Sequence, residues 1–264
     1  MQTILLIFFV LSAVIAIGVD DAFANDGKII LETTSLEHDT TWGRFNSLVQ
    51  VDSDTYALAY AGAGDDGYIS TFTISSDGSS IVEVDTLEHD TTRVWYNSLV
   101  QVDSDTYALA YEGGGNDKDG YISTFTIASD GTITPIRIQD HASHASASAN
   151  LEHDTTNGGH NSLVQVDSDT YALAYKGDGN DGYISTFTIS SSGDITAVKT
   201  QSEGNNLEHD TGNGTHNSLL QIDSDTYALA YAGAGGDGYI STFTISSSGD
   251  ITAVKTQSEG NNLE

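Results

Sequence analysis

The 264-residue sequence contains no cysteine, one proline, and only eight lysine or arginine residues against 38 aspartate or glutamate residues. Without cysteine the protein has no disulfide framework and no thiolate chemistry. The formal net charge of −30 argues against nucleic acids and anionic membrane surfaces as partners, because both require basic residues that neutralise phosphate. Helix-favouring runs are absent while Tyr, Ile, Val, Thr and Phe are plentiful, so the composition favours an all-β fold.

Long apolar runs are also lacking, except at residues 4–19. This stretch is followed by Ala22-Phe23-Ala24 and then by polar residues, a pattern typical of a secretory signal peptide cleaved after Ala24. We expect residues 1–24 to be this signal peptide, with an uncleaved N-terminal anchor as the alternative, although the run is short for a membrane span. Either way, residues 25–264 are expected to be secreted or at the cell surface.

The rest of the sequence consists of four repeats. Each begins with Leu-Glu-His-Asp-Thr, and the copies start at Leu36, Leu87, Leu151 and Leu207. Each continues with a run ending in Asp-Thr-Tyr-Ala-Leu-Ala-Tyr and then with Gly-Tyr-Ile-Ser-Thr-Phe-Thr-Ile. Self-similarity at this period indicates one supersecondary unit stacked on copies of itself. We assign an N-terminal strand at 28–33 and four units, at about 36–86, 87–150, 151–206 and 207–262.

Each unit predicts four short strands. In the first unit they are residues 47–51, 55–61, 68–75 and 81–85, separated by an Asp-Ser-Asp turn, a glycine-rich loop and a Ser-Asp-Gly hairpin turn. The second strand has bulky Tyr56, Leu58 and Tyr60 on one face and alanines on the other, so we expect sheets stacked with bulky faces against small ones. Four antiparallel strands at this period predict a β-propeller blade, with a β-solenoid as the alternative.

A family resemblance agrees with this prediction. Residues 121–135, Tyr-Ile-Ser-Thr-Phe-Thr-Ile-Ala-Ser-Asp-Gly-Thr-Ile-Thr-Pro, resemble the strand–Asp-Gly–strand hairpin of lactonase-like, YVTN-type propellers. The His before the first strand and the Asp in the second loop are similar in placement to those of WD40 blades. The resemblance covers residues 28–264 and implies an all-β propeller of four-stranded antiparallel blades. The Trp-Asp ending of WD40 blades and any lactonase catalytic motif are missing, so it implies no activity.

The repeats also indicate how many blades the whole propeller has. Residues 182–208 and 238–264 are identical, and the second copy stops two residues into a fifth Leu-Glu-His-Asp. The strand expected at 28–33 has no matching set of inner strands. We therefore expect four blades of a larger propeller, of six to eight blades, that form an open arc with exposed edges.

The repeated histidines and aspartates form the first candidate site. One interpretation is a ring of metal ligands. The other is structural, with each imidazole donating to an Asp such as Asp66 in its own blade and the following Asp capping backbone amides. Identical repetition favours the structural role, because an active site normally breaks ring symmetry. The residues concerned are His38, His89, His153, His209, Asp39, Asp90, Asp154 and Asp210.

Two further polar patterns carry weaker signals. The Asp-x-Asp pairs 52/54, 103/105, 167/169 and 223/225 could bind Ca²⁺, but one pair supplies too few oxygen ligands, and turn formation is favoured. We therefore predict no metal or cofactor. The glycine-rich segment at 113–115 does not open a helix and is a weak phosphate-loop signal, and His141 and His144 fall in a low-complexity insertion expected to be a surface loop.

The second candidate site is where the copies differ, between the His-Asp motif and the first strand. Aromatic residues there could stack on sugar rings or anchor a protein partner, and arginine could pair with a carboxylate. The alternative is drift in a tolerant loop, with the aromatics covering a blade junction. The candidate ligand-binding residues are Trp42, Arg44, Phe45, Arg93, Trp95, Tyr96, His160 and His216.

These observations lead to three functional hypotheses. The first is a secreted, non-enzymatic recognition or adhesion module for a glycan or an extracellular protein. The second is an extracellular lactonase-like enzyme or other hydrolase, whose acid/base pair would lie in further blades, since no catalytic residue is identified in these four. The third is a surface-layer or structural repeat protein without a small ligand.

Overall fold

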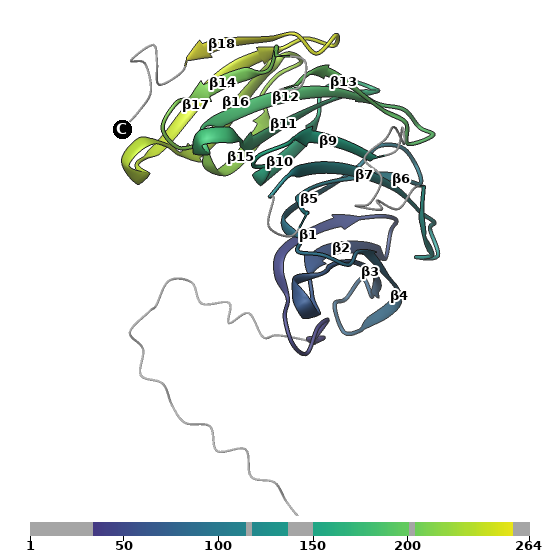
Figure 1. The fold of residues 1–264 in the computed structure, drawn as a ribbon. Coiled ribbons are helices and arrows are strands. Elements are labelled where there is room, and N and C mark those ends of the chain that lie inside the picture. The colour runs from purple at the N-terminus through teal and green to yellow at the C-terminus, as the bar shows by residue number, and fades with distance from the viewer. Residues whose placement is uncertain (1–33, 115–117, 137–149, 201–203, 256–264) are drawn as a thin grey trace, which may run out of the picture. The chain divides into compact units, whose positions relative to one another are not determined.

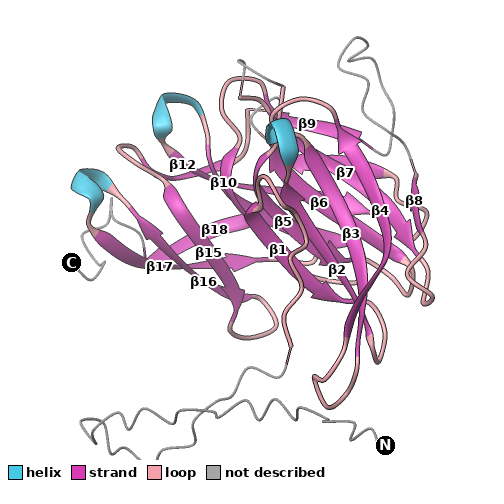
Figure 2. Cartoon of the chain, turned by 90° about the horizontal axis from the view of Figure 1, so that it is seen from below, coloured by secondary structure: helices cyan, strands magenta, loops and turns pink. Residues whose placement is uncertain are grey.

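The structure is a computed structural model that describes residues 34–114, 118–136, 150–200 and 204–255. The chain divides into two units, Met1–Thr33 and Thr34–Glu264. The first unit lies outside the described residues, as do the predicted signal peptide and the strand at 28–33. The second contains four antiparallel sheets, here called blades 1 to 4 in chain order (Figures 1 and 2). No helix among the described residues is long and apolar enough to cross a membrane.

The strands of each blade pair in chain order from the inside outwards. Blade 1 contains β1 (Arg44–Gln50), β2 (Thr55–Ala61), β3 (Gly67–Ile74) and β4 (Ile81–Asp90). Blade 2 contains β5 (Trp95–Gln101), β6 (Thr106–Glu112) and β7 (Gly120–Ile127), with β8 (Ile133–Pro135) and β9 (Asn150–Asp154) both paired to β7. Blade 3 contains β10 (Gly159–Gln165), β11 (Thr170–Lys176) and β12 (Gly182–Ile189), with β13 (Ile195–Lys199) and β14 (Leu207–Asp210) both paired to β12. Blade 4 contains β15 (Thr215–Gln221), β16 (Thr226–Ala232), β17 (Gly238–Ile245) and β18 (Ile251–Lys255).

Single 3-10 turns stand in the loops between the second and third strands of three blades. They are η1 (Ala63–Asp65), η2 (Asp178–Asn180) and η3 (Ala234–Gly236). The innermost strands of successive blades contact one another, β1 with β5, β5 with β10 and β10 with β15 (Figure 1). This is the arrangement of a β-propeller, so the predicted all-β fold of four-stranded blades is confirmed.

The blades stack bulky face against small face, as the alternation in the second strand predicts. Between blades 1 and 2, Ala57 and Ala59 pack with Tyr107, Leu109 and Tyr111 in one buried cluster. Equivalent clusters join blade 2 to blade 3 and blade 3 to blade 4. Full burial of a large apolar side chain contributes about 1.5–3 kcal/mol, so these clusters are the main source of stability.

Hydroxyl groups cross every one of these blade junctions. Between blades 1 and 2, the Ser47 hydroxyl accepts from the Leu99 amide at 2.9 Å. Thr55 donates to the Ser129 carbonyl at 3.0 Å, and Thr71 donates to the Gly131 carbonyl at 2.6 Å. The same three bonds recur at the next two junctions. The invariant Ser and Thr of each repeat therefore fix how one blade sits on the next.

The Leu-Glu-His-Asp segments lie on a different blade from the one expected. Residues 87–90 are the end of β4 and pair with β3 in blade 1, and β9 and β14 likewise complete blades 2 and 3. The predicted unit boundaries at 87, 151 and 207 therefore do not coincide with blade boundaries. The reason is that each third strand is longer than the predicted outer strand, and its remaining backbone groups pair with this segment.

Candidate functional site

Four equivalent residues at the start of the inner strands share an unusual backbone. Phe45, Tyr96, His160 and His216 have φ between 55° and 57°, and the strand pairing shifts register beside each of them. Positive φ is uncommon for residues other than glycine and costs about 1–2 kcal/mol per residue. All four blades therefore hold a bulky ring at a position where glycine would be easier, a form of strain that often accompanies function.

In blades 3 and 4 the asparagine after the ring residue bonds to the preceding blade, whereas neither amide atom of Asn97 in blade 2 has a hydrogen-bond partner among the described residues. Asn161 donates to the Tyr96 carbonyl of the preceding blade at 3.2 Å and to the Gly158 carbonyl at 2.8 Å. Asn217 repeats both bonds, to the carbonyls of His160 and Gly214. These bonds link neighbouring blades and keep the rings aligned.

The four rings form a continuous row across the blades. The ring centroids are 4.7 Å apart for Phe45 and Tyr96, 3.9 Å for Tyr96 and His160, and 4.7 Å for His160 and His216. With the four asparagines that follow them, they line a depression of about 220 Å³. We call these four side chains the axial row, because they stand on the innermost strands.

Charged groups beside the axial row break the repeat. Glu112 ends β6 and is buried, and Arg93 holds its carboxylate at 2.9 Å. The Arg93 guanidinium also lies 4.3 Å from the centre of the Trp95 ring, in cation–π geometry. Lys176 occupies the position of Glu112 in blade 3, and alanine occupies it in blades 1 and 4. Sequence reasoning missed Glu112 and Lys176, although they stand at the one variable position that follows an invariant Tyr-Ala-Leu-Ala-Tyr.

The surroundings shift the pKa values of these groups. Burial raises the pKa of Glu112, and the positive charges of Arg93, Lys176 and Lys118 oppose the shift. Burial, together with His216 and Lys176, lowers the pKa of His160 to about 4. His160 is therefore neutral at pH 7 and presents an uncharged ring. Burial also lowers the pKa of Lys176, and the negative charge of Glu112 opposes this shift.

The candidate ligand-binding residues thus divide into two groups. The structure brings together the four rings of the axial row and Trp95, whose ring lies 5.6 Å from that of Phe45 and 6.2 Å from that of Tyr96. Arg93 joins this group through Trp95. Trp42 and Arg44 form an exposed pair of their own, with the guanidinium 3.8 Å from the indole centre.

The repeated histidines lie between blades. His89, His153 and His209 are buried, and each points its ring edge-on at a tyrosine and a phenylalanine of the following blade. Among the described residues, neither nitrogen of these three imidazoles has a hydrogen-bond partner. Burial lowers the pKa to about 4 for His89 and to about 3 for His153 and His209.

The predicted hydrogen bond from an imidazole to an aspartate is therefore not made by His89, His153 or His209 in the described part of the chain. The imidazole of His89 lies against the backbone of Gly67, where even a Cβ would collide with it, and the rings around it are apolar. Asp66 instead lies beside Glu88, whose charge adds to burial in raising the pKa of Asp66. The histidine acts through shape, as a wedge between two blades. His38, in the first copy, makes the same edge-on contact with Tyr60 of blade 1.

The repeated aspartates accept hydrogen bonds from backbone amides two or three residues further on. Asp39, for example, accepts from the amides of Thr41 and Trp42 at 2.8 and 2.7 Å. The other three copies make the same kind of bond, to Thr92, to Thr156 and Asn157, and to Gly212 and Asn213. In the Asp-x-Asp turns, the first Asp accepts from the next amide, as Asp52 does from Ser53. No cluster of three or more His, Asp or Glu in the described part of the chain could hold a metal ion. His141 and His144 lie outside the described residues.

No known protein family matches the sequence, and no curated protein matches it. The fold is similar to the periplasmic gluconolactonase of Pseudomonas aeruginosa, with a TM-score of 0.58, 12% identity, and coverage of 80% of this chain and 56% of that one. A putative 6-phosphogluconolactonase of Bacteroides uniformis gives a TM-score of 0.56 at 12% identity, covering 82% of this chain and 54% of that one. Sqt1 of Saccharomyces cerevisiae gives 0.52 at 11% identity, covering 86% and 51%. The chain thus spans about half the length of these structures, and the likeness shows the fold alone.

Proposed function

We propose that this propeller is a non-enzymatic recognition module, acting outside the cytoplasm, that binds a carbohydrate carrying a carboxylate at the axial row. The observation that carries the proposal is the row itself, four rings kept in contact in a strained backbone conformation in every blade. Sugar rings pack against aromatic side chains, and the row places several such rings along one depression of about 220 Å³.

The charge distribution supports an acidic ligand. The chain carries only eight basic residues, yet Arg93, Lys118 and Lys176 all act on Glu112 beside the row. A concentration of positive charge on an otherwise strongly acidic protein attracts an anion locally and repels it elsewhere. Arginine is well suited to a carboxylate because its planar fork can donate two parallel hydrogen bonds.

Calorimetric titration of the purified full chain with a uronic acid trisaccharide, and with the neutral trisaccharide of the same stereochemistry, tests the proposal. We expect the acidic sugar to bind at least tenfold more tightly than the neutral one. Tyr96→Ala should weaken binding of both sugars, while Arg93→Gln should mainly remove the preference for the acid. Val82→Ala, at an exposed residue of the outer strand β4, is the control and should leave both affinities unchanged. Equal affinity of wild type and Tyr96→Ala would reject the axial row as the site.

Glu112 favours a second candidate, hydrolysis of a sugar lactone. A buried carboxyl group whose pKa is raised is a candidate for proton transfer, and Glu112 occurs in one blade only. The similarity in fold to gluconolactonases agrees with this candidate without carrying it. Ring opening of an aldonolactone, followed by pH-stat titration, would support the enzyme if wild type accelerates it and Glu112→Gln lowers the rate at least a hundredfold. If wild type does not accelerate ring opening, the lactone-hydrolase candidate is rejected and the recognition module is retained.

A further inference from the structure

Asn97, in blade 2, is buried at the wall of the depression that the axial row and its asparagines line, here called the axial depression. The residue is 9% exposed, and neither its amide nitrogen nor its carbonyl oxygen has a hydrogen-bond partner among the described residues. A buried polar group without a partner costs free energy comparable with a lost hydrogen bond. The described part of the chain therefore gives this amide no structural role.

The equivalent asparagines in blades 3 and 4 do have such a role. Asn161 and Asn217 each donate to two carbonyls, one in the preceding blade and one three residues earlier in the chain. Their carbonyl oxygens alone lack a partner among the described residues. In blade 1, Asn46 donates to the Gly43 carbonyl at 3.3 Å. Asn97 is thus the copy whose donor is released from the backbone.

A substitution three residues before Asn97 accounts for this release. The carbonyl at that position belongs to glycine in the other three blades and to Val94 in blade 2. A Cβ on Gly158 of blade 3 would collide with the Cα of Gly120, so a valine cannot follow the path of the glycine. Val94 is instead fully buried with its side chain against Gly67, and its carbonyl does not receive the Asn97 amide.

Two more donors of the same stretch are buried without a partner among the described residues. They are Nε of Arg93 and Nε1 of Trp95. The centre of the Trp95 ring lies 6.2 Å from that of Tyr96, so these groups adjoin the axial row. Blade 2 contacts blade 1 on one side and blade 3 on the other, so the burial of this stretch does not depend on either end of the described arc.

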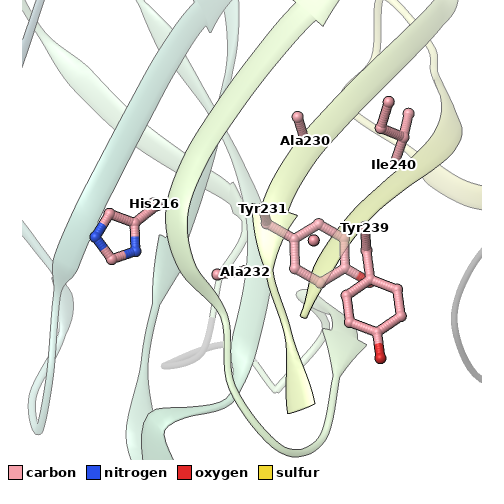
Figure 3. Close-up of a pocket in the computed structure, with 7 residues that line it drawn as sticks. His216, Ala230, Tyr231, Ala232, Tyr239 and Ile240 are labelled. Atoms are coloured by element: carbon pink, nitrogen blue, oxygen red, sulfur yellow. The ribbon is translucent and has the colours of Figure 1, made fainter. Parts of the chain in front are cut away.

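A larger hollow on blade 4 differs in character from the axial depression. It has a volume of about 530 Å³, reaches His216 and lies over Ala230 and Ile240 (Figure 3). Its lining is chiefly apolar, so hydrophobic contact would have to recognise an occupant there. The axial depression is therefore the better match for a polar ligand.

We propose that the Asn97 amide determines specificity in the axial depression by binding two hydroxyls on neighbouring carbons of a sugar ring. The side-chain amide presents an acceptor and a donor side by side, and each sugar hydroxyl can donate or accept. Two adjacent hydroxyls therefore satisfy both amide atoms at once. A carboxylate only accepts and would leave the Asn97 carbonyl oxygen unpaired, so the acidic group of the ligand belongs at Arg93. This inference rests on the proposed sugar binding and narrows the ligand to a sugar acid with a free diol.

Calorimetric titration with a 1,4-linked uronic acid trisaccharide, whose rings carry free hydroxyls at C2 and C3, and with its 3-deoxy analogue tests the proposal. We expect wild type to bind the analogue at least about tenfold more weakly, because one amide atom is then left without a partner. Asn97→Ala should bind the two sugars with equal affinity. Equal affinity of wild type for the two sugars would overturn the proposal. A variant that keeps the wild-type preference would also overturn it, and would assign the amide to a trapped water molecule. Failure of wild type to bind either sugar would instead reject the proposed sugar binding, and this inference with it.

Thermal unfolding in the absence of sugar separates a binding role of Asn97 from a structural one. Asn97→Leu replaces an unpartnered amide by an apolar group of similar size, so its melting temperature should equal or exceed that of wild type. Asn161→Leu is the matched control and should melt several degrees lower, because the bonds to the carbonyls of Tyr96 and Gly158 are lost. An Asn97→Leu variant that melts as low as Asn161→Leu would overturn the proposal, because the amide would then be structural.

Discussion

The three buried histidines predict a steep loss of stability in mild acid. His89, His153 and His209 are wedged between blades, and burial lowers their pKa values from 6.5 to about 4, 3 and 3. The unfolded chain therefore takes up protons below pH 6.5 that the folded chain does not accept. The stability that these groups contribute is fully present above pH 6.5 and is lost as the pH falls toward the folded-state values.

The magnitude follows from the pKa difference. At pH 5, 1.5 units below the unfolded pKa and above the folded one, each histidine costs about 2 kcal/mol of folding free energy, at about 1.4 kcal/mol per unit. Three histidines together cost about 6 kcal/mol, which is comparable with the whole stability of many domains. Buried carboxyl groups with raised pKa values, such as Glu112 and Asp154, act in the opposite sense.

Urea unfolding of wild type and His209→Gln at pH 7.5 and pH 5.0 isolates one histidine from these opposing groups. The variant should be less stable than wild type at pH 7.5, because the edge-on contacts with Tyr231 and Phe243 are lost. The difference in unfolding free energy between wild type and His209→Gln should be about 2 kcal/mol smaller at pH 5.0, because the variant has no imidazole to protonate at this position. A gap that stays constant across this range would refute the reasoning, because it would mean that His209 titrates alike in the folded and unfolded chain.

Three further predictions concern the backbone and the blade junctions. Replacing Phe45 and His216 together by glycine should give a protein about 2 kcal/mol more stable than the double alanine variant, which corresponds to about 4–8 °C in melting temperature. Both double variants lack the rings, but only glycine adopts the positive φ without strain. Equal melting temperatures of the two variants would argue against backbone strain at these positions. Thr124→Val should lower the free energy of unfolding by about 1–2 kcal/mol in chemical denaturation, because the Gly193 carbonyl loses the hydroxyl that crosses from blade 2 to blade 3. Thr126→Val is the control, because the Thr126 hydroxyl bonds within its own blade, and it should lower the free energy of unfolding by less than about 0.5 kcal/mol. Equal losses in the two variants would contradict this role for Thr124. Gly120→Ala should lower the free energy of unfolding by about 1–3 kcal/mol, because a Cβ there meets the imidazole of His153 and the backbone of Gly158. A melting temperature equal to that of wild type would show that the His153 imidazole can move aside.

Much of the fold could be predicted from the repeats because local pattern and long-range packing agree. The alternation of Tyr56, Leu58 and Tyr60 with alanine predicts which face is covered, and the second strand of blade 1 has the predicted bounds, Thr55–Ala61. The outer strand was harder, because Asp85 and Thr86 interrupt its apolar pattern while β4 continues to Asp90 through bulges. Pairing of Leu-Glu-His-Asp with the preceding blade depends on contacts that no local pattern contains.

The site could be predicted in part. The window in which the copies differ led to the axial row, because residues at one repeat position must come together when the blades share an axis. The separation of Trp42 and Arg44 from that row could not be predicted, since loop side chains follow local contacts rather than the repeat. The apolar surroundings of the repeated histidines were also missed, because a His beside an Asp in sequence suggests a hydrogen bond that the burial between blades does not provide.

The most direct test of the axial row is to follow the imidazole proton and nitrogen signals of the histidines by nuclear magnetic resonance during titration with a uronic acid trisaccharide. The signals of His160 and His216 should shift with saturation, because their rings belong to the row. Those of His89, His153 and His209 should stay in place, because they are buried between blades. Saturating shifts confined to the buried histidines, or no shift at His160 and His216 when binding is detected calorimetrically, would contradict the account.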